Sequence, residues 1–288
     1  MKESVIPKLT NDSLARQLIS LYETFKDKDL KNNEDINFSL SELDWACPLL
    51  ILPVASYIAS TNSNYLIDDD NKIKSYLETI KFPDGINSVS DFKKRIFKSK
   101  NYIPISILKR EGSIERERLE SIFTELIYKI VDRANVKGLK NVICHPIAEL
   151  VTNIFEHSKK DEGFVFGQYY KNKNILEICI VDRGRGLANA YQQENELKLS
   201  DEEAIGEVMK GHSTKPDKER GYGVRTSKKI VCGALGGEFV ILSGSAALIS
   251  TKEKDRLIAL PNFYWQGVVV AYRIPIPETP VDISPYLE

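Results

Sequence analysis

HPIAELVTNIFEHSKKDEGFVFGQYYKNKNILEICIVDRGRG, residues 145 to 186, is the stretch that decides the fold of this chain. Its first part predicts a helix, because apolar residues recur there at helical spacing. These residues are Ile147, Leu150, Val151, Ile154 and Phe155. Glu149 and Asn153 stand four residues apart and therefore project from one side of the helix. One face of the helix can pack against a core while another presents polar groups to a ligand.

The second part of the stretch predicts a β-hairpin that ends in a polar turn. Residues 163–170 and 174–181 have the length and apolar content of strands, and the KNK between them suits a turn. Asp182 follows the second strand, and Gly184 and Gly186 make the next turn permissive. A carboxylate at a strand end beside bare backbone suits a polar ring, although a tight surface turn uses the same residues.

Another glycine motif lies further along the chain, where Gly221-Tyr222-Gly223 precedes a segment with a helical pattern, residues 226–235. Glycines that open a helix leave backbone N–H groups free, and the helix dipole adds a partial positive charge, so the position favours a phosphate. Taken alone, such a motif is more often a plain turn. Its meaning depends on the two motifs that precede it.

The order and spacing of the three motifs resemble the N, G1 and G2 boxes of the GHKL ATPase superfamily. This superfamily includes gyrase-type ATPases, histidine kinases and anti-sigma-factor serine kinases. The matching segments are Glu149-x-x-x-Asn153, Asp182-x-Gly184-x-Gly186 and Gly221-x-Gly223. The resemblance covers residues 140–275, and ELVTNIFEHS is most similar to the N box of the anti-sigma-type serine kinases. It implies an α/β fold, a Bergerat-type sandwich with helices packed on one mixed sheet.

The resemblance implies that the G1 box binds the adenine of ATP. Asp182 would accept a hydrogen bond from the adenine amino group, while Gly184 and Gly186 would let the backbone approach the base and sugar. One departure concerns the final strand, where many members carry Gly-Thr with the hydroxyl close to the adenine. Here the matching pair is Gly267-Val268. A lost neutral hydrogen bond weakens binding by about 1 kcal/mol, so base affinity or selectivity is affected more than the phosphate site.

The other two boxes are expected at the phosphates and the metal. Asn153 would be the Mg²⁺ ligand through its amide oxygen, and Gly221 and Gly223 would contribute backbone at the phosphates. Glu149 is the candidate catalytic residue, because it is placed to orient or deprotonate a nucleophile near the γ-phosphate. That nucleophile is water or a protein hydroxyl, and the sequence does not distinguish the two.

Residues 187–220 would form the ATP lid of the family. The segment contains one helix candidate, residues 200–209, followed by GHSTKPDKER, whose glycine, proline and charges predict mobility. Lys215 and Arg220 are candidates for neutralising phosphate charge, although solvated charges are common in such segments.

Residues 1–110 predict a smaller α/β domain, and residues 111–288 the ATP-binding domain, which an amphipathic helix starting at Ser113 would open. In the first domain, helical patterns over 13–25, 45–59 and 71–80 alternate with strand-like patterns over 36–40, 64–67 and 102–108. This order is similar to that of the STAS domains that accompany anti-sigma kinases. The likeness implies a regulatory or partner-binding role.

The composition does not indicate a nucleic-acid or membrane partner. Forty basic and 41 acidic residues leave a formal charge of −1, with no sustained run of either sign. The first residues lack the pattern of a signal peptide, and the longest apolar run, residues 48–55, is too short for a membrane span. We therefore expect a cytoplasmic protein. The 4 cysteines stand far apart among apolar neighbours, which predicts free buried thiols rather than a metal site.

The sequence thus predicts an intracellular ATP-binding regulator that uses Mg-ATP to phosphorylate a protein partner or to switch partner binding. The first domain would choose the partner. One alternative is a conformational ATPase of the gyrase type, in which Glu149 activates water and ATP drives formation of a homodimer. Another is a nucleotide-binding scaffold without turnover, in which Asp182 binds the base and Glu149 has no chemical role.

Overall fold

The computed structural model describes residues 2–9, 13–88, 90–91, 101–109, 121, 124–125, 127–129, 131, 136, 138–160, 162–212 and 223–287, and of residues 149–157 the backbone. Lys215, Arg220 and Gly221 lie outside this part of the chain, as do the side chains of Glu149 and Asn153. Most of the helix predicted to start at Ser113 lies outside it too.

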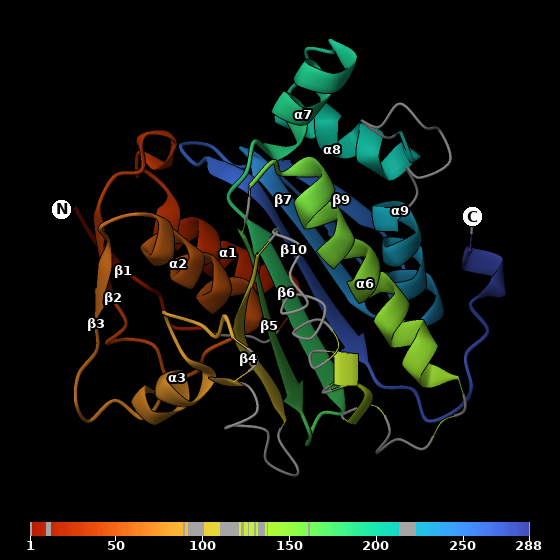
Figure 1. Ribbon diagram of the computed structural model, residues 1–288, viewed down its shortest axis with the longest axis horizontal. Coiled ribbons are helices and arrows are strands. Elements are labelled where there is room, and N and C mark those ends of the chain that lie inside the picture. The colour runs from red at the N-terminus through yellow and green to blue at the C-terminus, as the bar shows by residue number, and fades with distance from the viewer. Residues whose placement is uncertain are drawn as a thin grey trace.

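A 7-stranded sheet occupies the middle of the molecule (Figure 1). Its spatial order is β4 (Tyr102–Lys109), β5 (Glu162–Tyr170), β6 (Ile175–Asp182), β10 (Trp265–Pro275), β7 (Glu238–Gly244), β8 (Ala246–Ser250) and β9 (Asp255–Ala259). The α/β class is confirmed. Each pair of neighbouring strands from β4 to β9 in this order is antiparallel, including the two pairs that β10 forms with β6 and β7. The expectation of a mixed sheet is therefore wrong.

One face of this sheet is covered by α6 (Leu139–His157), α9 (Gly223–Lys228) and the π-helix η3 (Lys229–Ala234) (Figure 1). The two predicted helices are thus present, and α6 begins before His145. Ile178 and Ile180 of β6 share a buried cluster with Ile147 of α6 and Ile230 of η3. Because side chains alternate along a strand, the even-numbered residues of β6 point to this side, which we call the α6 face.

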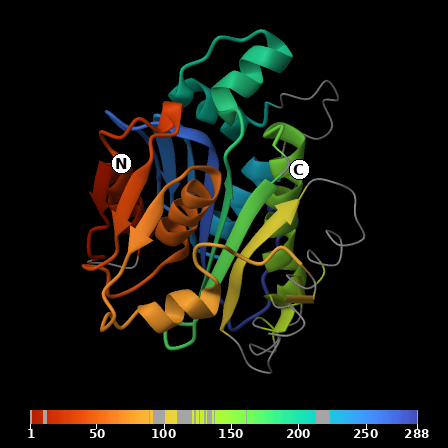
Figure 2. The ribbon, with the colours of Figure 1, turned by 60° about the vertical axis from the view of Figure 1, so that its left-hand side comes forward.

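The opposite face of the sheet is covered by α1 (Leu14–Phe25) and α2 (Pro48–Ser60) (Figure 1). A second, parallel sheet of 3 strands lies on their far side, as Figure 2 shows, in the order β1 (Lys2–Val5), β2 (Ile36–Ser39) and β3 (Asn64–Leu66). With α3 (Lys74–Ile80), these elements form what we call the N-terminal layer. β1 was not predicted, and the other elements match the predicted helices and strands of this region within a few residues.

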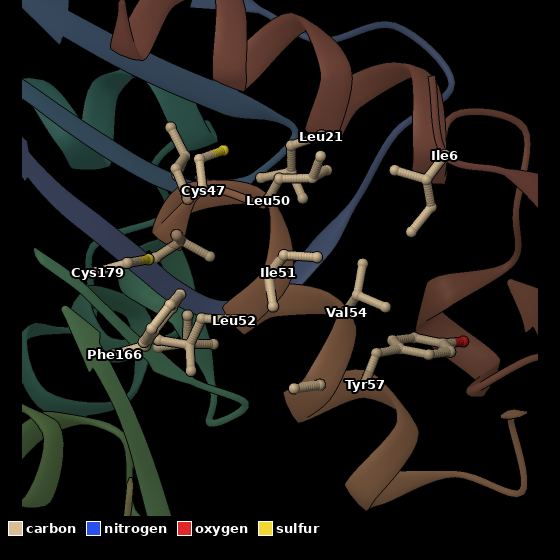
Figure 3. Packing of buried hydrophobic residues seen from close by; sticks show 14 of the residues in the cluster. Ile6, Leu21, Cys47, Leu50, Ile51, Leu52, Val54, Tyr57, Phe166 and Cys179 are labelled. Atoms are coloured by element: carbon tan, nitrogen blue, oxygen red, sulfur yellow. The ribbon is translucent and has the colours of Figure 1, made fainter. Parts of the chain in front are cut away.

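α2 is apolar on all sides because it lies between two sheets. Leu50, Ile51 and Leu52 point in successive directions around the helix and are all fully buried (Figure 3). Leu52 lies near Phe166 of the large sheet, whereas Tyr57 faces the N-terminal elements (Figure 3). Pro48 occupies the first turn, where a missing N–H costs nothing.

The N-terminal layer and the large sheet share one buried apolar cluster. Leu18 and Leu50 belong to it, and so do Phe166 and Val269. The strand over 102–108, which the sequence analysis assigned to the first domain, pairs with β5 in the large sheet. The division at residue 110 remains a prediction, but the two parts of the chain meet across a continuous core.

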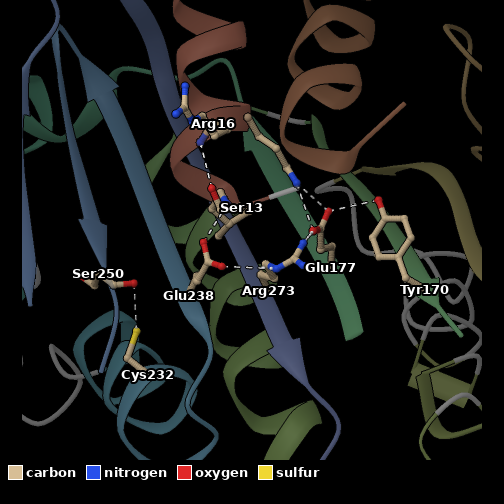
Figure 4. A network of polar contacts seen from close by, with 10 residues as sticks. Ser13, Arg16, Tyr170, Glu177, Cys232, Glu238, Ser250 and Arg273 are labelled. Carbon is tan, nitrogen blue, oxygen red and sulfur yellow. Dashed lines mark hydrogen bonds and ion pairs between the residues drawn. The ribbon is translucent and has the colours of Figure 1, made fainter. Parts of the chain in front are cut away.

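A chain of charged groups also ties α1 to the large sheet (Figure 4). Gln17 Nε2 donates to both carboxylate oxygens of Glu177, at 3.1 and 3.0 Å, and Arg273 pairs with the same carboxylate. Arg273 Nε lies 3.4 Å from Glu238 Oε1, and Glu238 Oε2 accepts the Leu14 N–H at 2.8 Å. Glu177 is 1% exposed, so water does not screen its charge. The start of α1 is therefore held by the carboxylates of Glu177 and Glu238, both of which pair with Arg273.

Two expectations from composition concern cysteines and membranes. All 4 cysteines are free, with Cys47, Cys179 and Cys232 buried and Cys144 half-buried, in agreement with the predicted thiols. Among the helices that the structure describes, none has the length and apolar character that crossing a bilayer requires.

Candidate functional site

Asp182 ends β6 on the α6 face, in line with Ile178 and Ile180. Its side chain is 6% exposed, and Oδ1 accepts the Gly184 N–H at 2.8 Å. Burial raises the pKa of this carboxyl group to about 7, although backbone hydrogen bonds from Gly184 and Val268 favour the charged form. The predicted carboxylate at the strand end is thus a desolvated group with weak local compensation rather than a residue of a surface turn.

The side chains in the same cross-strand row as Asp182 are small. Gly163 and Val268 are its partners on the two neighbouring strands, and Val268 in turn pairs with Ser243. Ser243 pairs with Ala246 on the next strand. In a sheet, residues paired in this way project to the same face. The carboxylate is therefore flanked by small groups on the α6 face, which suits the approach of a flat ring.

Gly184 brings the turn after Asp182 against the end of α6. A Cβ atom at this position would lie 2.4 Å from the backbone oxygen of Ser158, the residue that follows α6. The same oxygen accepts the Arg185 N–H at 3.2 Å. The close approach of two backbones explains the glycine, and it joins α6 to the turn that follows Asp182.

Gly184→Ala is expected to destabilise the protein by about 2 kcal/mol, because the added methyl group meets backbone that cannot rotate away. Gly206→Ala is the matched control, since a Cβ atom there meets nothing within 4 Å and Gly206 lies inside a helix. That change should leave stability unchanged or raise it slightly. Urea unfolding of both variants measures the difference, and equal stabilities would contradict the close contact at Ser158.

Ser243 is a site residue that the sequence analysis missed. Its buried hydroxyl accepts the Leu187 N–H at 3.0 Å and donates to the Gly267 oxygen at 2.9 Å. It thereby holds the start of α7 (Gly186–Asn195) against β10. No local signal marks this serine, because its role depends on the order of β6, β10 and β7.

Gly267-Val268 does lie at the position that the sequence analysis gave it. Val268 is the direct cross-strand partner of Asp182, so a hydroxyl at residue 268 would stand beside the carboxylate. Gly267 has a φ of +107°, and a Cβ atom there would lie 2.2 Å from the backbone oxygen of Asp182. The glycine is required by this close approach, whereas the valine replaces a polar contact with an apolar one.

The segments of the first and third predicted motifs reach the same face of the sheet as Asp182, as far as the structure describes them. Glu149 and Asn153 belong to α6, which packs against β5 and β6. Gly223 begins α9, whose Ser227 hydroxyl donates to the Pro146 oxygen of α6 at 3.4 Å. The fold therefore brings α6, the turn after Asp182 and the start of α9 to the α6 face.

The start of the predicted lid consists of two helices rather than one, α7 and α8 (Asp201–Lys210). Asp201 Oδ2 accepts the N–H and the hydroxyl of Ser245, at 2.7 and 2.8 Å, which fixes α8 to the turn between β7 and β8. Tyr191 of α7 is 2% exposed, and its hydroxyl donates to the His212 oxygen. α7 and α8 are thus each held by a specific contact, and the predicted mobility of the segment remains a prediction, since residues 213–220 lie outside the described part of the chain.

Comparison with models of known protein families finds no match, and comparison with curated proteins finds no similar sequence. The assignment of the three motifs remains a prediction from their residues. Within the described ranges, no group of three or more His, Cys, Asp and Glu side chains is placed to hold a metal ion.

Proposed function

We propose that this protein binds ATP on the α6 face of the large sheet, with Asp182 as the acceptor for the adenine amino group. The observation that carries the proposal is the burial of this carboxylate in a row of small side chains. A buried acid with a raised pKa incurs a free-energy cost in the unliganded protein, and groups of this kind cluster at functional sites. An amino N–H would supply the hydrogen bond that stabilises the charged form.

The rest of the site follows from the resemblance to the GHKL superfamily. Asn153 would hold Mg²⁺, whose preference for oxygen ligands an amide meets. The backbone of Gly221 and Gly223 would lie at the phosphates, and Gly186 would lie near the sugar. Lys215 and Arg220 would balance phosphate charge. In this proposal the large sheet with α6 and α9 is a Bergerat-type sandwich, whose second face the N-terminal layer covers.

The function that we propose is that of a regulator, in which bound Mg-ATP supplies a phosphoryl group to a partner protein or changes the binding of that partner. The N-terminal layer would select the partner, because it is joined to the large sheet by a shared core and by the Glu177–Arg273–Glu238 chain. Glu149 would orient or deprotonate the attacking hydroxyl group.

Calorimetry with ATP and Mg²⁺ tests the first part of the proposal, and an absence of binding at millimolar ATP would exclude it. Incubation with γ-labelled ATP then tests the reaction. Label on a partner protein supports the regulator, free phosphate supports a conformational ATPase, and intact ATP supports a scaffold. Each outcome requires a different role for Glu149.

Glu149→Gln is expected to reduce phosphate transfer by about a hundredfold while ATP affinity stays within a few-fold. The amide has nearly the shape of the carboxylate but is not a base, so binding and chemistry should separate. Single-turnover transfer from γ-labelled ATP measures the rate, with calorimetry on the same sample. A variant that transfers phosphate like the parent would place the catalytic role elsewhere.

A further inference from the structure

Arg183 directly follows Asp182 and points to the other side of the sheet. It is 8% exposed and lies between two aromatic rings of the opposite face. The guanidinium carbon is 4.4 Å from the ring centre of Tyr57 in α2 and 5.3 Å from that of Trp265 in β10. Adjacent residues of one turn therefore lie in two environments, the candidate adenine site and the N-terminal layer.

The charge of Arg183 has little compensation. Nη2 donates to Asn33 Oδ1 at 2.6 Å, and among the described residues no carboxylate forms an ion pair with this side chain. Burial lowers the pKa of Arg183 to about 10, so the guanidinium remains charged at neutral pH. A buried charge without a counter-ion is unfavourable even beside aromatic rings, and an apolar side chain would pack there at lower cost. Packing alone does not account for an arginine.

The peptide unit between Asp182 and Arg183 is held from the face of the sheet that the N-terminal layer covers. Trp265 Nε1 donates to the Asp182 oxygen at 3.3 Å, and the Trp265 ring packs against Phe25 of α1 with 5.6 Å between ring centres. A rotation of this peptide that adjusts the Asp182 carboxylate would also move the guanidinium. Movement on the α6 face is thus linked by covalent geometry to Tyr57 and Trp265.

The far end of this connection is the loop over residues 29–35, in which Lys31, Asn32 and Asn33 are exposed and Leu30 is buried. Asn33 has a φ of +52° and follows the short helix η1 (Leu30–Asn32), and the next residue, Glu34, offers its backbone oxygen to the Tyr57 hydroxyl at 2.7 Å. Arg183 and Tyr57 thus hold the loop over residues 29–35 by one hydrogen bond each. The loop is also held by Lys2, whose N–H donates to the Asp35 backbone oxygen at 3.0 Å and whose Nζ lies 3.2 Å from Glu34 Oε1, and by the buried side chain of Leu30. Among these contacts, the hydrogen bond from Arg183 starts in the turn that follows Asp182.

We propose that Arg183 is a positioning residue that couples the nucleotide site to this loop, so that a nucleotide at Asp182 orders residues 29–35. The inference rests on the proposed ATP site and adds to it the surface that responds. Lys31, Asn32 and Asn33 of the loop are exposed, and the loop belongs to the layer assigned to partner selection. Binding of a nucleotide on one face of the sheet would then alter the partner surface on the other.

Hydrogen exchange over residues 29–35, with and without the ATP analogue AMP-PNP and Mg²⁺, tests the coupling. In the parent protein, saturating analogue should slow exchange over these residues by about fivefold. This factor corresponds to the lower end of typical coupling free energies. Arg183→Met keeps an apolar chain of similar length and should abolish the response while analogue still binds. Arg185→Met is the matched control, because Arg185 lies in the same turn but contacts Gln193 and Glu194 of α7. It should keep the response.

Three results would overturn the inference. These are an equal response in Arg183→Met and the parent, a response lost equally in Arg185→Met, or a complete loss of analogue binding in Arg183→Met. If the parent protein binds no nucleotide, the proposed function fails. The coupling is then tested by comparing the parent and the Asp182→Asn variant, both without ligand. Asp182→Asn should change exchange over residues 29–35 without any ligand, and identical exchange in the two free proteins would exclude a link.

Discussion

Asp182→Asn is expected to abolish ATP binding and, at the same time, to stabilise the free protein at pH 8. The two effects have opposite signs because the carboxylate is unfavourable without a ligand and favourable with one. For binding, the amide would lose a charge-assisted hydrogen bond and turn a donor toward the adenine amino group, so affinity should fall at least about a hundredfold.

The gain in stability follows from the pKa of Asp182, which burial raises from 3.8 to about 7. Between these pH values the folded protein holds a proton that the unfolded chain has released, so the stability of the parent falls as pH rises. At pH 8 the penalty is fully present and amounts to about 4 kcal/mol. An amide has no charge to desolvate, so the advantage of the variant should shrink as pH is lowered toward 4.

Thermal unfolding from pH 4 to 8 measures the stability difference, and calorimetry measures the affinity. Asp201→Asn is a matched control, because Asp201 accepts two hydrogen bonds from Ser245 in a packed contact. It should lower stability and leave ATP affinity within a few-fold. If Asp182→Asn loses stability as well, the carboxylate has a structural role; if it binds ATP like the parent, the adenine assignment is wrong.

Arg273→Met is expected to destabilise the protein by about 3–5 kcal/mol, the usual cost of leaving one partner of a buried ion pair alone. Glu177 is 1% exposed and would keep the hydrogen bonds from Gln17 but lose its counter-ion. Glu238 would lose the same partner. Urea unfolding should show a midpoint shift with an unchanged slope if the native core remains compact.

The double variant Glu177→Gln/Arg273→Met provides the control. Removal of both charges should restore much of the stability, because the penalty comes from the unpaired carboxylate rather than from a lost attraction. The same experiment tests the division at residue 110. A single transition in the parent and two transitions in Arg273→Met would show that this chain of charges joins two units. A loss below about 1 kcal/mol would mean that water reaches Glu177.

Much of the fold was predictable from local patterns. The helix after Ser13 and the strand from Ile36 have clear periods, and the structure places Ser13 as the N-cap of α1. The turn after Asp182 was readable because strand, acid and glycines follow one another directly. These signals are short-range, since each depends on residues within one or two turns of the chain.

What could not be predicted depends on pairing between distant segments. Nothing around Tyr102 indicates that its strand pairs with β5 rather than with the N-terminal strands, and nothing around Trp265 places β10 between β6 and β7. Ser243 and Arg183 gain their roles from those pairings alone. α7 was missed because its sequence, GLANAYQQEN, has few apolar residues, and its two buried side chains, Ala190 and Tyr191, are adjacent and give little periodic signal.

The position of β10 has a consequence for synthesis of the chain on the ribosome. The strands β4 to β6 and β7 to β9 form two separate groups until β10 inserts between them, and β10 ends at Pro275. The nascent protein therefore cannot close its sheet until residue 275 has been translated. During that interval α2 lacks one of the surfaces that cover it, and its apolar sides remain open to chaperones and to other nascent chains. Chains that terminate before Trp265 should aggregate or be degraded rather than accumulate as a folded fragment.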